Sequence, residues 1–152
     1  MPEGLDTVIG GSAIDEARAD AVYKQGLDYE AQGDRAGAIA AYREAVSHGS
    51  KSQHFHRLAY LLDLMGEEDE AVQMYETARE SGPPRLQSLI NLAVLYEDRG
   101  EFSKAEYILN QVIESEPNEP RAQLFLKDVQ ASRGMYYDDD ADRSSTRHDA
   151  IL

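Results

Sequence analysis

The sequence contains no cysteine and no tryptophan, and its basic residues are few. Without cysteine, the chain can form neither a disulfide scaffold nor a thiolate zinc site, and cysteine nucleophilic catalysis is excluded as well. Lys and Arg number 15 against 29 Asp and Glu, which gives a formal charge of −14 over 152 residues. Because a surface this acidic repels phosphate groups, we expect no direct binding of nucleic acid or of anionic membranes by these residues.

Long apolar runs are also missing. No stretch approaches the roughly 20 apolar residues that span a bilayer. The segment 1–11 lacks the basic start and apolar centre of a secretory signal, so we expect a cytoplasmic protein. Apolar residues still make up 41% of the chain, which suffices for a hydrophobic core, while the aromatic share of 8% favours thin packing layers.

What the sequence does contain is an internal repeat. Three segments that begin at Gly33, Gly66 and Gly100 align without gaps, and their glycines are 33 and then 34 residues apart. In each segment, small or apolar residues recur with a spacing of four and then three, which marks one face of an α-helix. These residues are Ala38, Tyr42 and Ala45, then Ala71, Tyr75 and Ala78, then Ala105, Leu109 and Val112.

A second helical pattern precedes each of these glycines. It consists of Val22, Gly26 and Tyr29, then Phe55, Ala59 and Leu62, then Leu89, Ala93 and Tyr96. Each unit is therefore predicted to be a helix, a tight turn at a glycine in the left-handed conformation, and a second helix. Pro83 and Pro117 follow the second and third units, where a helix must end. The predicted fold is all-α and built of antiparallel helix pairs.

This pattern resembles the tetratricopeptide repeat, a helix-turn-helix unit of 34 residues. The resemblance implies a right-handed α-solenoid with three repeats at about 19–51, 52–85 and 86–119. A capping helix is expected at 120–134, because Lys127 and Gln130 replace the small and aromatic residues of the pattern. We expect the repeat domain to span 12–134, with Ser12 as a helix cap, after a flexible leader at 1–11 and before an acidic linker or tail at 135–152.

The resemblance also predicts a binding surface, because the first helix of each repeat lines a concave face in this family. Its fifth and ninth positions point inward and form a largely apolar stripe, which Leu124 continues in the cap. Carboxylates further along the same helices form an acidic edge. The stripe consists of Tyr23, Leu27, His56, Tyr60, Ile90 and Val94, and the edge of Glu30, Asp63, Glu97 and Asp98.

Two interpretations of this stripe are open. An apolar stripe is often buried core, either between neighbouring helices or beneath the N-terminal segment folded back. Alternatively, it is a docking groove for an extended or helical segment of a protein partner. In the second case, the acidic edge predicts a partner that carries Lys or Arg beside its apolar residues.

The sequence shows no catalytic or metal signature, so we predict no enzyme activity, no cofactor and no metal. It has no Gly-rich phosphate loop, no His-Glu-x-x-His motif and no serine elbow. His54 and His56 are two residues apart and thus face different sides of a helix. Asp138, Asp140 and Asp142 have the spacing of a calcium loop, but Arg143 stands where that loop requires glycine.

Two weaker resemblances concern three positions of the first helices and the residues after Gly134. Some members of the family clamp a C-terminal carboxylate with paired Lys, Arg and Asn residues, and the corresponding positions here are Lys24, Arg57 and Asn91. Tyr23 and His56 beside them do not suit such a clamp. The residues after Gly134 are similar to a linker in bacterial proteins that continue into a domain like the C-terminal domain of the RNA polymerase alpha subunit. This resemblance implies an alternative function, as the N-terminal module of a transcription-associated protein.

Overall fold

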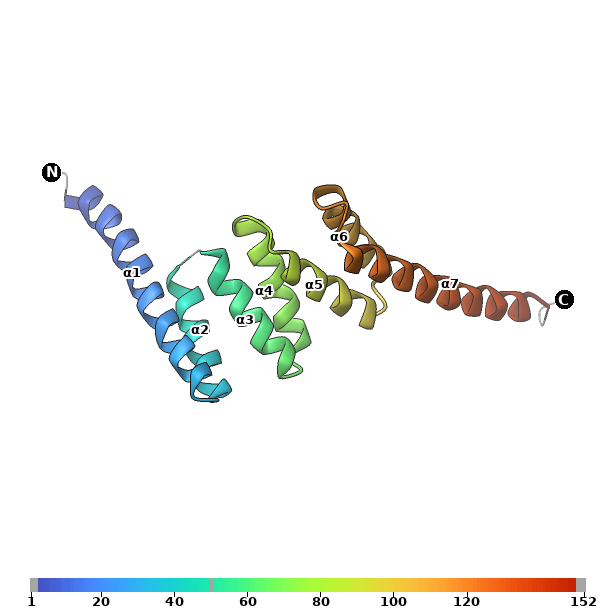
Figure 1. Cartoon of the computed structure of the whole chain (residues 1–152), viewed down its shortest axis with the longest axis horizontal. Coiled ribbons are helices and arrows are strands. Elements are labelled where there is room, and N and C mark those ends of the chain that lie inside the picture. Colours follow the sequence, from blue (N-terminus) through green and yellow to red (C-terminus); the bar gives the residue numbers. More distant parts are fainter. Residues whose placement is uncertain (1–2, 50, 150–152) are drawn as a thin grey trace. The chain divides into compact units, whose positions relative to one another are not determined.

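The computed structural model describes the backbone at 3–49 and 51–149, and the side chains at 15–49 and 51–135. Within these limits the backbone forms helices and no strand, which confirms the all-α prediction (Figure 1). The helices are α1 (Glu3–Ala31), α2 (Arg35–His48), α3 (Ser52–Leu64), α4 (Glu68–Ser81), α5 (Leu86–Asp98), α6 (Phe102–Ser115) and α7 (Pro120–Asp149). The chain divides into two compact units, Met1–Ser88 and Leu89–Leu152.

The turns inside the three helix pairs share one geometry. Gly33, Gly66 and Gly100 have φ values of +78°, +78° and +76°, in the left-handed region that glycine occupies without strain. After the first glycine, the amide of Asp34 donates to the carbonyl of Tyr29 at 2.9 Å, and Gly33 itself donates to Glu30 at 2.9 Å. These two bonds satisfy carbonyls at the end of α1, and the other two turns repeat them. The predicted glycine turns are therefore confirmed.

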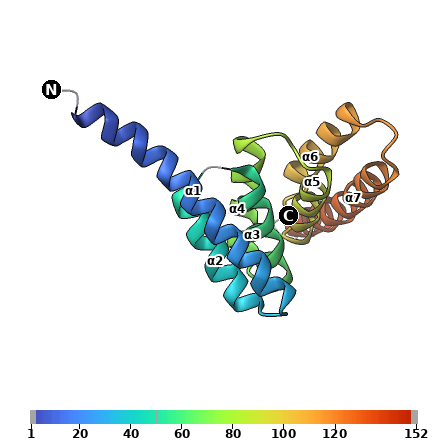
Figure 2. The same ribbon diagram turned by 60° about the vertical axis from the view of Figure 1, so that its left-hand side comes forward.

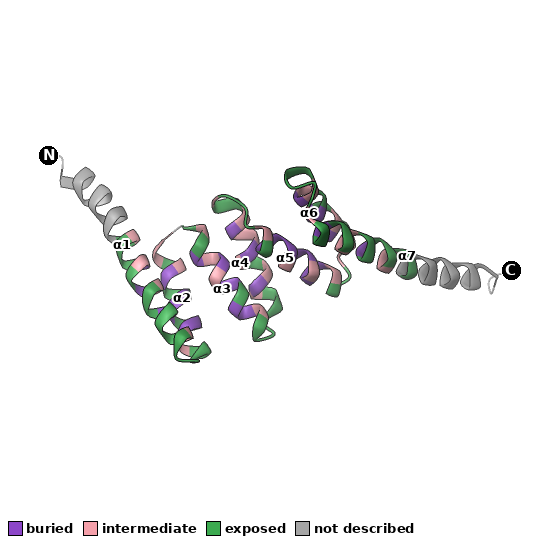
Figure 3. Cartoon of the chain, in the orientation of Figure 1, coloured by how far each residue is buried: buried purple, intermediate pink, exposed green. Residues whose placement is uncertain are grey.

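The repeating residues form the core. In α2, Ala38, Tyr42 and Ala45 are fully buried, and the corresponding residues of α4 and α6 are buried to the same degree. Figure 3 shows buried residues on the helices of both units. Burial of a large apolar side chain stabilises a fold by about 1.5–3 kcal/mol. Because these positions recur in register, each pair is held by the same kind of contact.

The first unit consists of two helix pairs, α1 with α2 and α3 with α4, which lie side by side (Figure 2). A close approach fixes the first pair at Gly26 of α1. A Cβ atom at that position would lie 2.3 Å from the ring of Tyr42 in α2, well inside van der Waals contact. Only glycine therefore allows the Tyr42 ring to lie this close to the α1 backbone.

In the second unit, α5 and α6 form a pair and α7 packs on α6. The ammonium group of Lys104 lies 5.4 Å from the ring centroid of Tyr96, which links α6 to α5. Arg133 of α7 donates to the Glu106 carboxylate of α6 at 2.9 Å. These contacts join the predicted capping helix to the third pair.

Both terminal helices extend further than the sequence predicts. Helix α1 begins at Glu3, so the backbone is helical through the expected leader and past the expected cap at Ser12. Helix α7 continues beyond Gly134 to Asp149. No proline lies between 3 and 31 or between 121 and 149, so nothing in these segments removes a helical hydrogen bond. The domain limits at 12 and 134 stay predictions.

Candidate functional site

In the first unit, the predicted stripe lies on α1 and α3. Tyr23 is half-buried, and its ring centroid lies 5.4 Å from that of Tyr42 and 4.5 Å from that of His54. Tyr23 thus belongs largely to the packing between helices. His56 is buried as well, with 4% of its surface exposed. These two positions fit the interpretation of the stripe as core.

Leu27 of α1 and Tyr60 of α3 are the exposed members of the stripe in this unit. Leu27 is 38% exposed and Tyr60 is 40% exposed. They occupy equivalent positions, 33 residues apart, on helices that contact one another through Tyr23 and His54. We refer to Leu27, Glu30, Arg57 and Tyr60 together as the α1/α3 face. Contacts of Arg57 join Glu30 to Tyr60, and Leu27 precedes Glu30 by three residues on α1.

Glu30 of this face accepts hydrogen bonds from two side chains of other helices. Its carboxylate accepts a hydrogen bond from the Tyr42 hydroxyl at 2.7 Å and a second from Arg57 Nε at 2.7 Å. The second oxygen accepts from Nη2 of Arg57. Arg57 therefore binds Glu30 with two parallel donors, the geometry that makes such pairs specific. The network joins α1, α2 and α3.

The network shifts the ionisation of its members. Burial acts to raise the pKa of Glu30, but the hydrogen bonds from Arg57 and Tyr42 outweigh it and the pKa is lowered. Burial and the neighbouring Glu30 raise the pKa of the Tyr42 phenol, and the Glu30 pairing raises the pKa of Arg57. At neutral pH the pair is thus ionised, and its opposite charges largely cancel. Glu30 contributes less negative potential to the face than the sequence predicts.

Arg57 also covers part of Tyr60. Its guanidinium carbon lies 5.6 Å from the centroid of the Tyr60 ring, a cation–π distance. Arg57, Tyr60 and Leu64 follow each other by three and four residues, so they share one side of α3. Leu64 is 48% exposed and extends the apolar surface toward the end of the helix. Asp63 beside it is half-buried.

In the second unit, the predicted residues lie on α5 and are less exposed. Ile90 is buried at 3% exposure, and Val94 is half-buried. Glu97 is half-buried too, and it accepts a hydrogen bond from the Ser132 hydroxyl of α7 at 3.1 Å. Asp98, at the end of α5, and Leu124 of α7 are exposed. The carboxylate of Glu97 thus also helps to hold α7.

The roles of Arg57 and Tyr42 in the site do not follow from the sequence pattern. Tyr42 is buried in the core as predicted, but it and Arg57 both donate hydrogen bonds to Glu30. A signal was present in the sequence, because Arg57 stands one position after the inward His56 and one helix pair after Glu30. Opposite charges at such positions of successive first helices can meet. Because two donors of Arg57 already bind Glu30, Arg57 is poorly placed to clamp the carboxylate of a partner.

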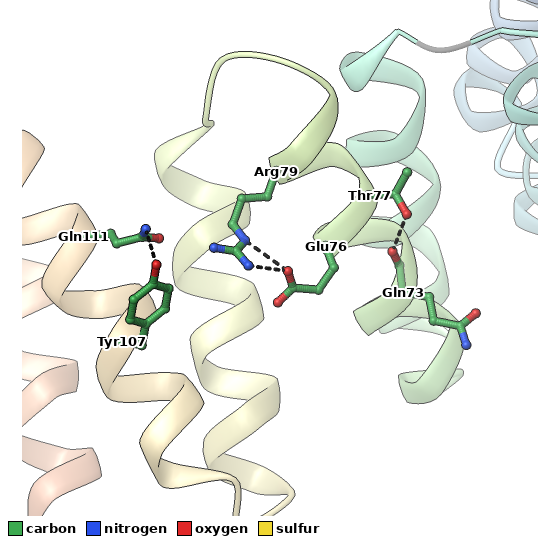
Figure 4. A network of polar contacts seen from close by, with 6 residues as sticks. All are labelled: Gln73, Glu76, Thr77, Arg79, Tyr107 and Gln111. Atoms are coloured by element: carbon green, nitrogen blue, oxygen red, sulfur yellow. Dashed lines mark hydrogen bonds and ion pairs between the residues drawn. The ribbon is translucent and has the colours of Figure 1, made fainter.

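The second helices of the pairs carry polar contacts of their own (Figure 4). In α4, Arg79 donates to Glu76 at 2.6 Å, and Thr77 donates to the carbonyl of Gln73 at 2.9 Å. In α6, Gln111 donates to the Tyr107 hydroxyl at 3.1 Å, and Tyr107 is 58% exposed. Each of these bonds lies within one helix and therefore stabilises that helix.

The part of the chain whose residues are described contains no group of three or more His, Asp or Glu side chains placed to hold a metal ion. The calcium-like spacing at Asp138, Asp140 and Asp142 lies outside the described side chains. Among the described residues, no helix combines the length and the apolarity that a membrane crossing requires.

The helix pairs, glycine turns and buried repeat positions define an all-α helical-repeat protein. Two family models described as tetratricopeptide repeats match residues 23–83 and 65–129. The chain belongs to the tetratricopeptide repeat family. Both matches end before residue 134, so they give no support to the resemblance that involves RNA polymerase alpha, which rested on the residues after Gly134.

Several relatives are named Photosystem I assembly protein Ycf3. The one from Prochlorococcus marinus subsp. pastoris is 28% identical over 127 residues, which cover 81% of this chain and 72% of the relative. The one from Cyanophora paradoxa is 28% identical over 134 residues, covering 76% of this chain and 78% of the relative.

Solved structures share the fold. A tetratricopeptide repeat protein from Parabacteroides merdae superposes with a TM-score of 0.70 at 24% identity, and the match covers 78% of this chain but 46% of that protein. This chain thus spans less than half of that protein. The Yersinia enterocolitica secretion chaperone SycD, solved with a peptide of the translocator YopD, has a TM-score of 0.65 at 18% identity, covering 75% and 93%.

Proposed function

We propose that this protein is a non-enzymatic interaction scaffold that binds an extended or helical segment of a protein partner on its first helices. The observation that carries the proposal is the α1/α3 face. There, Leu27 and Tyr60 are exposed at equivalent positions beside the Glu30–Arg57 pair. Apolar side chains that remain exposed at repeated positions of successive first helices are suited to contact apolar residues of a partner segment. Membership of the tetratricopeptide repeat family supports a protein partner.

The partner is expected to carry apolar residues together with Lys or Arg. The chain has a formal charge of −14, so its field attracts a basic segment. Since Arg57 neutralises Glu30, the attraction is expected to come from Asp63, Glu97, Asp98 and the overall charge. Leu27 and Tyr60 are the proposed anchors in the first unit. Val94 is the proposed contact in the second unit, since Ile90 is buried.

An assembly or chaperone role is the form of scaffold that the relatives favour. Two observations point this way: the relatives named Photosystem I assembly protein, and SycD, a secretion chaperone solved with a peptide of its translocator. We infer that this chain holds a segment of another protein while that protein is delivered or assembled. The cytoplasmic location, and the absence of direct nucleic-acid or membrane binding, stay predictions from the sequence.

Peptide selection tests this proposal. A displayed library of random peptides is selected against the full chain, and selected peptides are measured by fluorescence anisotropy. We expect enrichment of aliphatic or aromatic residues with Lys or Arg. Tyr60→Ala and Leu27→Ala should each weaken binding about tenfold, the loss of a contact worth about 1.4 kcal/mol. Raising the salt concentration should weaken binding further.

Tyr107→Ala is the matched control, because Tyr107 is also an exposed tyrosine but lies on α6, outside the α1/α3 face. Its affinity for the selected peptides should equal that of the unmodified chain. Circular dichroism must show equal helix content in all variants. Equal losses of affinity in the Tyr107 and Tyr60 variants, or enrichment of acidic peptides, would contradict the proposal.

A further inference from the structure

Two histidines of α3 are buried without hydrogen bonds. His54 has no exposed surface and His56 has 4%. Among the described residues, neither ring nitrogen of either side chain has a hydrogen-bond partner. An imidazole in water forms hydrogen bonds at both nitrogens, so burial of two such rings costs free energy that the fold must offset. This cost calls for a physical explanation.

An aromatic ring and several charged groups surround His54. Its ring packs on Tyr23 of α1, and its Nε2 atom lies 3.3 Å from Asp20 Oδ1, close enough to form an ion pair when the ring is protonated. The other oxygen of Asp20 accepts from Lys51 Nζ at 2.6 Å. The charge of Lys51 disfavours the protonated ring, and the charge of Glu16 in α1 favours it. Burial lowers the pKa of His54, and this effect outweighs the opposing attraction of Asp20.

The surroundings of His56 disfavour a protonated ring more strongly. Among the described charged groups, the one that acts on it is Arg85, which follows α4 and disfavours a second positive charge. Burial and Arg85 together lower the pKa of His56 from its ordinary value of 6.5 to about 4. A protonated ring needs an acceptor at both nitrogens, and neither nitrogen has one here.

We propose that α3 is an acid-sensitive element, and that protonation of His54 and His56 at mildly acidic pH opens the first unit while the second unit stays folded. The imidazolium of His56 finds no acceptor in the packed interface, so it is stabilised only when α3 separates from its neighbours and water reaches the ring. The imidazolium of His54 can pair with Asp20 and therefore contributes less. Between 89 and 135 the sequence contains no histidine, so the described part of the second unit lacks this response.

Three carboxylates of the first unit that form ion pairs do not produce the same effect in this pH range. The pKa values of Asp20, Glu30 and Glu70 are all lowered from ordinary values of 3.8 and 4.5. These groups therefore stay ionised at pH 5 in the folded chain. The effect of histidine between pH 7 and pH 5 can thus be separated from acid unfolding driven by these three carboxylates.

Hydrogen exchange of the full chain, read by mass spectrometry at pH 7 and pH 5, tests the proposal. Protection factors, which are corrected for the intrinsic effect of pH on exchange, are compared for peptides of α3–α4 and of α6. From the pKa of His56 alone, protection in α3–α4 should fall about 20-fold between pH 7 and pH 5. Protection in α6 should change less than about threefold.

Variants assign the effect to the buried rings. His56→Asn should remove most of the pH-dependent loss, and His54→Asn a smaller part. His48→Asn is the matched control, since the His48 ring is partly exposed at the end of α2 and should leave the loss unchanged. Each variant is compared with itself at the two pH values, so a constant change in stability cancels. Full retention of the loss in the His54/His56 double variant would overturn the proposal.

A second measurement needs no substitution. In spectra of the unmodified chain, the ring resonances of His56 in the folded population should keep the shifts of neutral imidazole down to pH 5. If the His56 ring becomes protonated while the peptides of α3–α4 keep their protection, the proposal is wrong. If protection in α3–α4 and α6 falls together, the opening is global and the proposal is equally wrong.

Discussion

At the scale of single residues, the three turn glycines carry one conformational requirement each. Gly33, Gly66 and Gly100 have positive φ, and a Cβ atom at any of them would meet no atom within 4 Å. Substitution is thus disfavoured by backbone conformation and not by collision. Gly26 shows the opposite case, in which space alone requires glycine.

This difference gives a prediction for Gly33. Gly33→Ala should lower the free energy of unfolding by about 1–2 kcal/mol, because alanine in the left-handed region is strained. Gly33→Asn should cost less, since asparagine tolerates that region better. Urea unfolding followed by circular dichroism measures both. Equal costs for alanine and asparagine would show that the turn does not depend on its backbone conformation.

The turns and the core could be predicted from the residue types, but the contacts among the site residues could not. Glycine, alanine and tyrosine recur in register, and local conformation and packing follow directly from them. The pairing of Glu30 with Arg57 depends on how α1 and α3 meet, which no local pattern determines. The same holds for His56 and Ile90, whose inward positions were predicted but whose burial depends on neighbouring helices.

At the scale of elements, one carboxylate ties three helices together. Tyr42 of α2 and Arg57 of α3 both donate to Glu30 of α1. The core position Tyr42 therefore has two roles, because its ring fills the space at Gly26 and its hydroxyl reaches the α1/α3 face. The packing of α1 on α2 and the position of Glu30 on the α1/α3 face thus both depend on Tyr42.

Tyr42→Phe separates these roles. The ring stays, so packing is kept, while the loss of a hydrogen bond to a charged group should cost about 1.5–3 kcal/mol of unfolding free energy. Tyr107→Phe, whose hydroxyl is bound by Gln111 on an exposed surface, should cost less than about 0.5 kcal/mol. Chemical denaturation of both variants provides the comparison. A Tyr42→Phe chain as stable as the unmodified one would show that Arg57 alone satisfies Glu30.

At the scale of the whole molecule, stability should fall with acid in two stages. His54 and His56 have lowered folded pKa values, so they contribute stability that is present above about pH 6.5 and is lost as pH falls. For His56 this loss continues toward its folded pKa of about 4. Carboxylates with lowered folded pKa values, among them Glu30, contribute stability that is present above 4.5 and is lost at lower pH.

Thermal unfolding at pH 7.5, 5 and 3.5 should therefore show two separate decreases in the melting temperature. Glu30→Gln should reduce only the decrease below pH 4.5, because glutamine does not titrate. The double substitution of His54 and His56 by asparagine should reduce mainly the decrease above it. A single decrease confined to pH values below 4.5 would show that the buried histidines do not contribute.

The turns at Gly33 and Gly66 also provide two equivalent sites between which a distance within the first unit can be measured. The chain has no native thiol, so a cysteine introduced at a chosen position is chemically unique. Gln32 and Met65 stand just before the two glycines, are exposed, and lie at equivalent places of successive helix pairs. Spin labels attached at Gln32→Cys and Met65→Cys would report the separation of α1–α2 from α3–α4 directly, in ångströms, at any pH and with any bound partner.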